Sequence, residues 1–178
     1  MEEEKLDCWY AIRTFNCKEM EISEFLKEKH LHSFVPMTIA EKFRKNEDKP
    51  KRIFVPVIHN YLFLKKTKPE REISKILNEC RIPLSVIKKE NTSKFYEVSD
   101  KEMNEFRLLC DPDFDNSIFM EKDEADAKAG KDVIIIHGQF EGIKGKLYRK
   151  DNNFYFIKTL VGIGVMVRIS RWYCKVLK

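Results

Sequence analysis

The 178-residue sequence lacks the patterns that mark several large classes of protein. It contains no apolar run near the roughly 20 residues that a membrane-spanning helix needs. Its first residues, MEEEKLD, are acidic and have no signal-peptide pattern. The five cysteines are widely spread and none pairs at CxxC spacing, which predicts neither a zinc site nor a disulfide framework. We therefore expect a cytoplasmic, monomeric protein with reduced thiols, no cofactor and no membrane association.

Motifs for metal binding and catalysis are also missing. The aspartates between Asp111 and Asp115 resemble the start of a calcium loop, but Asn116 stands where that loop needs glycine. His30 and His32 share one face of an extended segment, but no third ligand accompanies them. No Ser-His-Asp or Cys-His arrangement is evident either. The sequence predicts no metal site and no enzymatic activity.

Charge is present in quantity but unevenly distributed. The formal net charge is +5, yet residues 111–130 hold 2 Lys and Arg against 7 Asp and Glu, and residues 131–178 hold 10 against 3. Such asymmetry favours a polyanionic partner for the basic part, although basic surfaces often do nothing but bind water. We expect one domain at 1–110, an acidic linker at 111–130 and a second domain at 131–178.

The N-terminal part alternates strand and helix patterns. Ser99 and Glu102 form the S-x-x-E pattern of a capping box, and Pro69 suits the first residue of a helix. The order predicts an α+β fold, in which helices flank an antiparallel sheet. Strands are expected at 6–15, 33–37, 53–65, 84–89 and 94–99, helices at 17–30, 69–80 and 100–110, and an exposed charged loop or hairpin at 38–52.

The C-terminal part has no helical periodicity. Five short strands are expected at 132–137, 144–150, 153–160, 161–170 and 172–177, separated by glycines or by the Asp151-Asn152 turn. Five strands in under 50 residues favour a small closed barrel, which has no free edges.

The segment DVIIIHGQFEGIKGKL (132–147) could be a phosphate-binding loop or a set of tight turns. A P-loop needs glycine at position 140 and Ser or Thr at 147, where this chain has Phe140 and Leu147. A dinucleotide-binding loop would open a helix, but the next residues alternate like a strand. We therefore interpret Gly138, Gly142 and Gly145 as turn residues of the barrel.

The same segment resembles the KOW motif of the NusG family of transcription elongation factors, a motif also found in ribosomal proteins. The first half resembles the N-terminal (NGN) domain of that family at CWYAIRTF, at Phe34-Val35-Pro36 and at Val98–Glu102. The resemblance covers 7–110 and 128–177, and specialised paralogues such as the capsule-operon antiterminators of the UpxY type are the most similar in pattern. The KOW positions are Gly130, Val133, Ile135, Gly138, Phe140, Gly142 and Gly145.

The sequence departs from the family pattern at two turns. His59-Asn60-Tyr61 replaces the family's Pro-Gly-Tyr, and Val161-Gly162-Ile163 replaces the Phe-Gly-Arg turn that is linked to Rho and to a ribosomal protein. The loss of the aromatic residue and of the arginine from the second of these turns favours a specialised paralogue over the general factor.

The resemblance implies an elongation or antitermination factor whose first domain binds the clamp helices of RNA polymerase, and the alternative is an RNA-binding or ribosome-associated KOW protein. Aromatic residues are common interface anchors. Alternation along a strand turns about half of them inward, so we expect about half of the candidates to lie at the interface. Tyr10 and Tyr61 are the favoured interface residues, because a tyrosine hydroxyl tolerates contact with water. The polymerase-binding candidates are Trp9, Tyr10, Phe15, Phe54, Tyr61 and Phe63.

Basic residues at two places are candidates for contacts to DNA or nascent RNA. A solvated loop is the alternative for the hairpin, and a ribosomal protein partner is the alternative for the barrel. The candidates are Lys42, Arg44, Lys45, Lys49, Lys51 and Arg52 in the hairpin, and Lys144, Lys146, Arg149, Lys150, Arg168 and Arg171 in the barrel.

Overall fold

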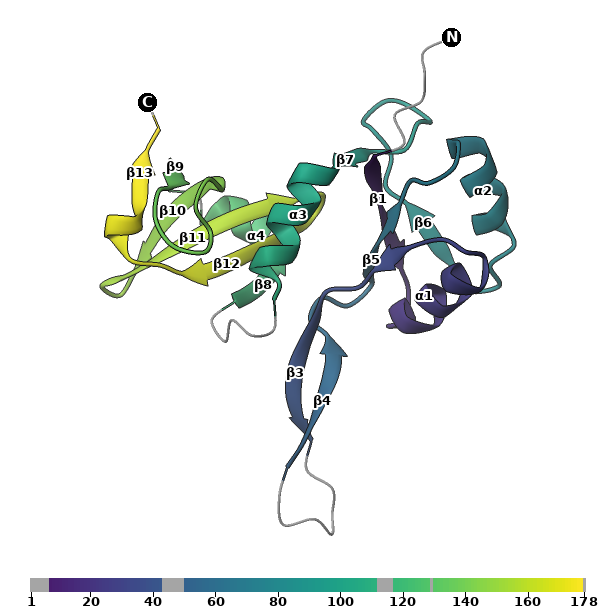
Figure 1. The fold of residues 1–178 in the computed structure, drawn as a ribbon, viewed down its shortest axis with the longest axis horizontal. Coiled ribbons are helices and arrows are strands. Elements are labelled where there is room, and N and C mark those ends of the chain that lie inside the picture. Colours follow the sequence, from purple (N-terminus) through teal and green to yellow (C-terminus); the bar gives the residue numbers. More distant parts are fainter. Residues whose placement is uncertain (1–6, 43–49, 112–116, 129, 178) are drawn as a thin grey trace. The chain divides into compact units, whose positions relative to one another are not determined.

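A computed structural model describes residues 7–42, 50–111, 117–128 and 130–177. The chain divides into two compact units (Figure 1). Unit 1 comprises Met1–Met37 and Phe54–Met103, and unit 2 comprises Thr38–Ile53 and Asn104–Lys178. No helix in the described ranges is long and apolar enough to cross a membrane.

Unit 1 is built on an antiparallel sheet centred on β1 (Cys8–Thr14), as the sequence predicts. The strand order is β2-β5-β1-β6, and β7 also pairs with β1. The other strands are β2 (Ser33–Phe34), β5 (Tyr61–Lys65), β6 (Leu84–Val86) and β7 (Glu97–Ser99).

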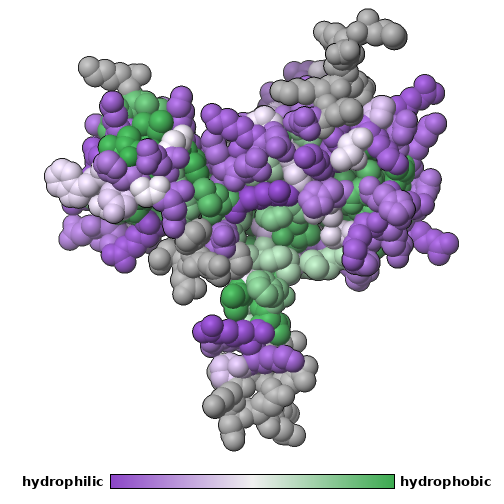
Figure 2. Space-filling view, viewed as in Figure 1, coloured by the Kyte–Doolittle hydropathy of each residue, from purple (hydrophilic) through white to green (hydrophobic). Residues whose placement is uncertain are grey.

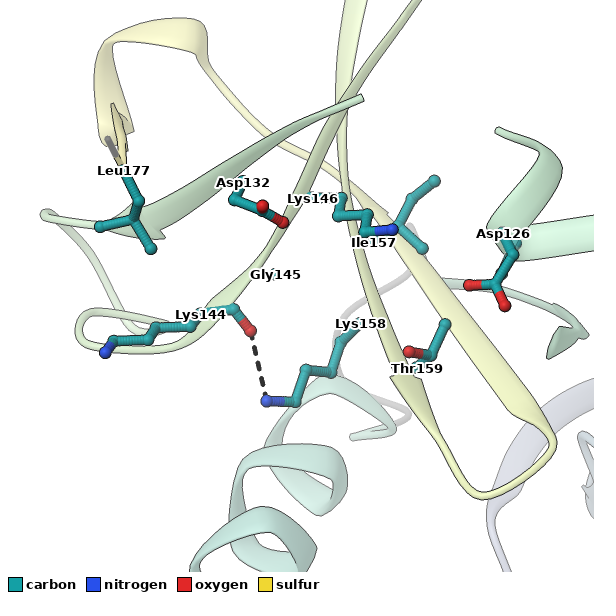
Figure 3. Close-up of a pocket in the computed structure, with 10 residues that line it drawn as sticks. Asp126, Asp132, Lys144, Gly145, Lys146, Ile157, Lys158, Thr159 and Leu177 are labelled. Atoms are coloured by element: carbon teal, nitrogen blue, oxygen red, sulfur yellow. Dashed lines mark hydrogen bonds between the residues drawn. The ribbon is translucent and has the colours of Figure 1, made fainter. Parts of the chain in front are cut away.

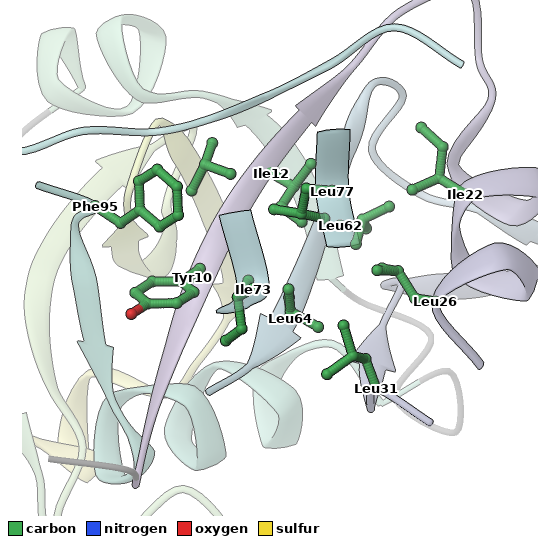
Figure 4. Packing of buried hydrophobic residues seen from close by; sticks show 11 residues of the cluster. Tyr10, Ile12, Ile22, Leu26, Leu31, Leu62, Leu64, Ile73, Leu77 and Phe95 are labelled. Atoms are coloured by element: carbon green, nitrogen blue, oxygen red, sulfur yellow. The ribbon is translucent and has the colours of Figure 1, made fainter. Parts of the chain in front are cut away.

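One face of this sheet carries a hydrophobic core shared with helices α1 (Glu19–Glu28) and α2 (Glu70–Asn78). Alternation along β1 turns Tyr10 and Ile12 toward this face, while Ile22 of α1 and Ile73 of α2 pack against it (Figure 4). Pro69 is the residue before α2 and not its first helical residue, so that prediction is off by one position.

The predicted capping box opens helix α3 (Asp100–Leu109). The Glu102 backbone N–H donates to Ser99 Oγ at 3.2 Å, and the Ser99 backbone N–H donates to Glu102 Oε2 at 3.1 Å. Two backbone donors at the helix start are thus satisfied by reciprocal side-chain acceptors.

The single strand predicted at 53–65 is wrong, because the chain turns in the middle of it. Strand β4 (Lys51–Pro56) pairs with β3 (Met37–Lys42) in a two-stranded hairpin, and β5 belongs to the main sheet of unit 1. Asn60 adopts a left-handed conformation with φ of 67°, which Asn tolerates better than most residues. Strand β4 ends at Pro56, and the turn at 57–60 leads the chain from the hairpin into β5 of the main sheet.

Unit 2 contains all five strands predicted for the C-terminal part, in an antiparallel sheet of six (Figure 1). The order is β13-β9-β10-β11-β12-β8, and no pairing between described residues joins the two ends of this order. These pairings therefore do not form the closed five-stranded barrel that the sequence predicts. The strands are β8 (Ser117–Glu121), β9 (Lys131–Ile135), β10 (Lys144–Lys150), β11 (Asn153–Leu160), β12 (Ile163–Arg168) and β13 (Cys174–Val176).

The sixth strand comes from the segment that the sequence indicates as a linker. Residues 117–127 form β8, which pairs with β12, and helix α4 (Lys122–Ala127). Met120 and Ala125 are buried, and a Cβ at Gly164 of β12 would lie 2.5 Å from the Ala125 Cβ. The many acidic residues conceal this short apolar pattern, and the sequence therefore does not indicate the strand and the helix that this segment contains.

The glycines of the segment 132–147 have two different roles. Gly138 and Gly142 both have φ of +87° in the loop between β9 and β10, and Phe140 lies in the same loop, so these three are turn residues as predicted. Gly145 is not, because it lies inside β10, where a Cβ would be 2.5 Å from the Ile157 carbonyl oxygen of β11. Its role is to allow close backbone approach.

We expect Gly145→Ala to destabilise the protein by about 2–3 kcal/mol, because strands β10 and β11 would have to separate to relieve the overlap. Gly142→Ala meets no neighbouring atom and is expected to cost only about 1–2 kcal/mol for the left-handed backbone. Urea denaturation of both variants measures the difference. A Gly145→Ala protein as stable as the wild type would contradict the close-approach explanation.

Candidate protein and nucleic-acid interfaces

Three of the six aromatic residues predicted to bind polymerase are buried. Trp9 is 1% exposed, and Tyr10 and Phe63 are fully buried. The Trp9 indole N–H donates to Asp100 Oδ1 at 2.8 Å, so even its polar group is engaged within the unit. The prediction that Tyr10 keeps an accessible hydroxyl is wrong, because the ring packs in the core at 5.1 Å from the Phe95 ring centroid.

The other three aromatic residues remain accessible. Phe54 on β4 is 64% exposed, Phe15 after β1 is 45% exposed, and Tyr61 at the start of β5 is half-buried. Figure 2 shows that the hairpin β3–β4 carries hydrophobic residues beside strongly hydrophilic ones. Phe54 is the most exposed of the three rings, which makes it the strongest of these candidate contacts.

A buried ion pair beside Tyr10 is a feature that sequence reasoning missed. Lys66 is 2% exposed, and its Nζ lies 2.9 Å from Glu97 Oε1 and 5.8 Å from the Tyr10 ring centroid. Burial opposes the charge on both partners, but the hydrogen bond and mutual attraction outweigh it, raising the pKa of Lys66 and lowering the pKa of Glu97. Burial also raises the pKa of Tyr10. The pair links Lys66, the residue after β5, to β7.

The basic hairpin is described only in part. Arg44, Lys45 and Lys49 lie outside the described residues, and of Lys42 only the backbone in β3 is described. Lys51 and Arg52 are exposed on β4, and Arg52 Nε lies 3.8 Å from Glu41 Oε1. An ion pair this exposed is weak, so Arg52 remains available to a phosphate.

In unit 2, five of the six predicted basic residues fall into two groups. Lys144 and Lys146 line a pocket of about 420 Å³ together with Asp126, Asp132 and Lys158 (Figure 3). The Lys158 ammonium donates to the Lys144 carbonyl at 3.2 Å and pairs with Glu105 at 2.8 Å. Carboxylates beside the lysines make this group less suited to a polyanion than the sequence suggests.

The second group combines arginines with aromatic rings, and we call it the aromatic–arginine surface. Trp172 is 85% exposed, and the Arg149 guanidinium lies 5.6 Å from the Phe154 ring centroid. Arg171 donates to the Cys174 carbonyl at 2.7 Å, which orients it. A depression of about 600 Å³ is lined by Phe154, Arg168, Arg171 and Trp172 with their neighbours Asn152, Asn153, Ile169 and Ser170. Lys150 is exposed on β10 but does not line this depression.

The comparison with protein families agrees with the fold of unit 1. Residues 7–107 match the family described as transcription termination factor nusG. The match spans more than half of the chain, and the chain belongs to the NusG family, a family of non-enzymatic transcription factors that generally bind RNA polymerase. No curated protein matches the chain.

Proposed function

We propose that this protein is a NusG-family factor that binds RNA polymerase and promotes processive elongation or antitermination. The observation that carries the proposal is the family match over residues 7–107, together with the exposed Phe54 within that segment. The contact is proposed to be made by Phe54, Phe15 and Tyr61 on the polymerase clamp helices, in the cytoplasm, by a monomer.

We further propose domain limits of 1–110 and 131–178, with residues 131–178 as a KOW domain that contacts nascent nucleic acid or a ribosomal protein. The surplus of basic residues in 131–178 and the turn glycines Gly138 and Gly142 support this assignment. The altered Val161-Gly162-Ile163 turn supports a specialised factor of the UpxY type, acting at particular operons such as capsular polysaccharide loci.

A second candidate is an RNA-binding or ribosome-associated role without polymerase. The aromatic–arginine surface favours it, because an exposed indole beside guanidinium groups is the arrangement on which unpaired bases stack.

A run-off transcription assay tests the proposal. On a template that carries the protein's own upstream leader, adding the wild-type chain is expected to increase full-length transcript at the expense of paused and terminated products. The Phe54→Ala chain, in which only an exposed side chain is shortened, serves as the matched control and is expected to be much less active. A transcript pattern that the wild-type chain does not change would contradict the proposal.

A further inference from the structure

Two turns of unit 1 bring a thiol, a carboxylate and an imidazole together. Cys17 lies in the turn between β1 and α1, Glu19 is the first residue of α1, and His59 lies in the turn before β5. One ligand atom from each of these side chains lies within 4.8 Å of the other two. Glu19 is 1% exposed, whereas Cys17 and His59 are exposed, so one of the three side chains is buried and the other two face solvent.

Asn60 holds the two turns against each other. Its backbone N–H donates to Glu19 Oε1, and its side-chain Oδ1 accepts from the Cys17 backbone N–H at 3.0 Å. Its carbonyl accepts from the Thr14 backbone N–H at 2.9 Å. These bonds fix the backbone of Cys17 and of Asn60, the residue after His59, and they involve neither the Cys17 thiol nor the His59 ring.

The backbone at this place is in an uncommon conformation. Asn16, Cys17 and Asn60 have φ of 57°, 55° and 67°. Left-handed conformations are unfavourable for a residue such as Cys, and they persist only where the surroundings impose them. The surroundings therefore hold the backbone of both turns in place, so the positions from which the three side chains start are fixed.

The chemistry of the three ligands indicates the ion. Thiolate and imidazole together favour zinc over magnesium or calcium, and a carboxylate completes a mixed set of three. Ligands of a tetrahedral zinc lie at most about 3.8 Å apart, because zinc–ligand distances are about 2.0–2.3 Å. Small rotations of the exposed Cys17 and His59 side chains would close the remaining gap around Glu19.

We propose that Cys17, Glu19 and His59 bind one Zn²⁺ ion, with the fourth position open to water or to a partner's side chain. The ion joins the β1–α1 turn to the β4–β5 turn. The proposal is independent of the proposed transcription function. No spacing motif in the sequence indicates it, since the ligands belong to distant segments that meet only in the folded sheet.

The test uses the full, untagged chain in a phosphine reductant, with Co²⁺ as a spectroscopic substitute for Zn²⁺. Wild-type protein is expected to bind one equivalent of Co²⁺ with a thiolate-to-cobalt charge-transfer band, and Zn²⁺ is expected to displace it. Cys17→Ser should remove the band. Cys17→Ser and His59→Asn should weaken Zn²⁺ binding by about 100-fold in competition with a chromophoric chelator, at the upper end of losses seen for metal-site changes.

The controls are Cys80→Ser and His30→Asn, which alter another thiol and another imidazole of unit 1 and should bind like the wild type. Glu19→Gln keeps an acceptor for the Asn60 N–H. Circular dichroism establishes that this variant is folded before its affinity for Zn²⁺ is compared with that of the wild type. Absence of the band in the wild type, its survival in Cys17→Ser, or equal loss in Cys80→Ser would each overturn the proposal.

Discussion

Replacing Phe63 by Ala is expected to lower the free energy of unfolding by about 3–5 kcal/mol, which is the usual cost of removing a buried phenyl ring. Phe63 is fully buried in β5. It lies opposite Ala11 of β1 and Phe34 of β2, and its ring centroid is 6.4 Å from that of Phe34. Alanine would leave a cavity between three strands that cannot close without moving the sheet. Urea denaturation monitored by circular dichroism measures the loss.

Phe54→Ala is the matched control for this prediction, because the same substitution is made nine positions earlier at a side chain that is 64% exposed. Its stability should remain within about 0.5 kcal/mol of the wild type. If both variants lost stability equally, the assignment of Phe63 to the core and of Phe54 to the surface would be wrong.

Binding to polymerase is expected to depend on the exposed ring of Phe54, which contributes little to stability. Phe54→Ala should weaken binding of the chain to core RNA polymerase by about 30-fold, because an aromatic anchor at the centre of an interface contributes about 2 kcal/mol or more. Exposure of this ring in the free protein allows it to be desolvated on binding. Biolayer interferometry with immobilised polymerase measures the change.

Tyr96→Ala provides the control for specificity, since Tyr96 is a 41% exposed aromatic residue of unit 1 that lies outside the predicted interface. It should bind polymerase like the wild type. Equal losses in Phe54→Ala and Tyr96→Ala would mean that Phe54 has no special role at the interface.

Local signals allowed much of the fold to be predicted. The reciprocal Ser99–Glu102 bonds and the left-handed Asp151 and Asn152, with φ of 48° and 59°, follow from chemistry within a few residues. The five C-terminal strands follow from alternation between turns. Such patterns are readable because neighbouring residues alone decide them.

What could not be predicted depends on contacts between distant segments. Phe54 and Phe63 lie in one apolar run, and only the turn at 57–60 sends one to the surface and the other into the core. Gly145 is a close-approach glycine because of β11, which follows it in the chain. The pairing of β8 with β12 likewise joins segments more than 40 residues apart. Sequence periodicity records which side chains are apolar but not which partner covers them.

The most direct test of the central claim is the affinity of the full wild-type chain for core RNA polymerase, measured beside its affinity for ribosomal RNA at the same salt concentration. We expect saturable binding to polymerase that a clamp-helix fragment competes away, with weaker and strongly salt-dependent binding to the RNA. Tight binding to ribosomal RNA together with no binding to polymerase would contradict it.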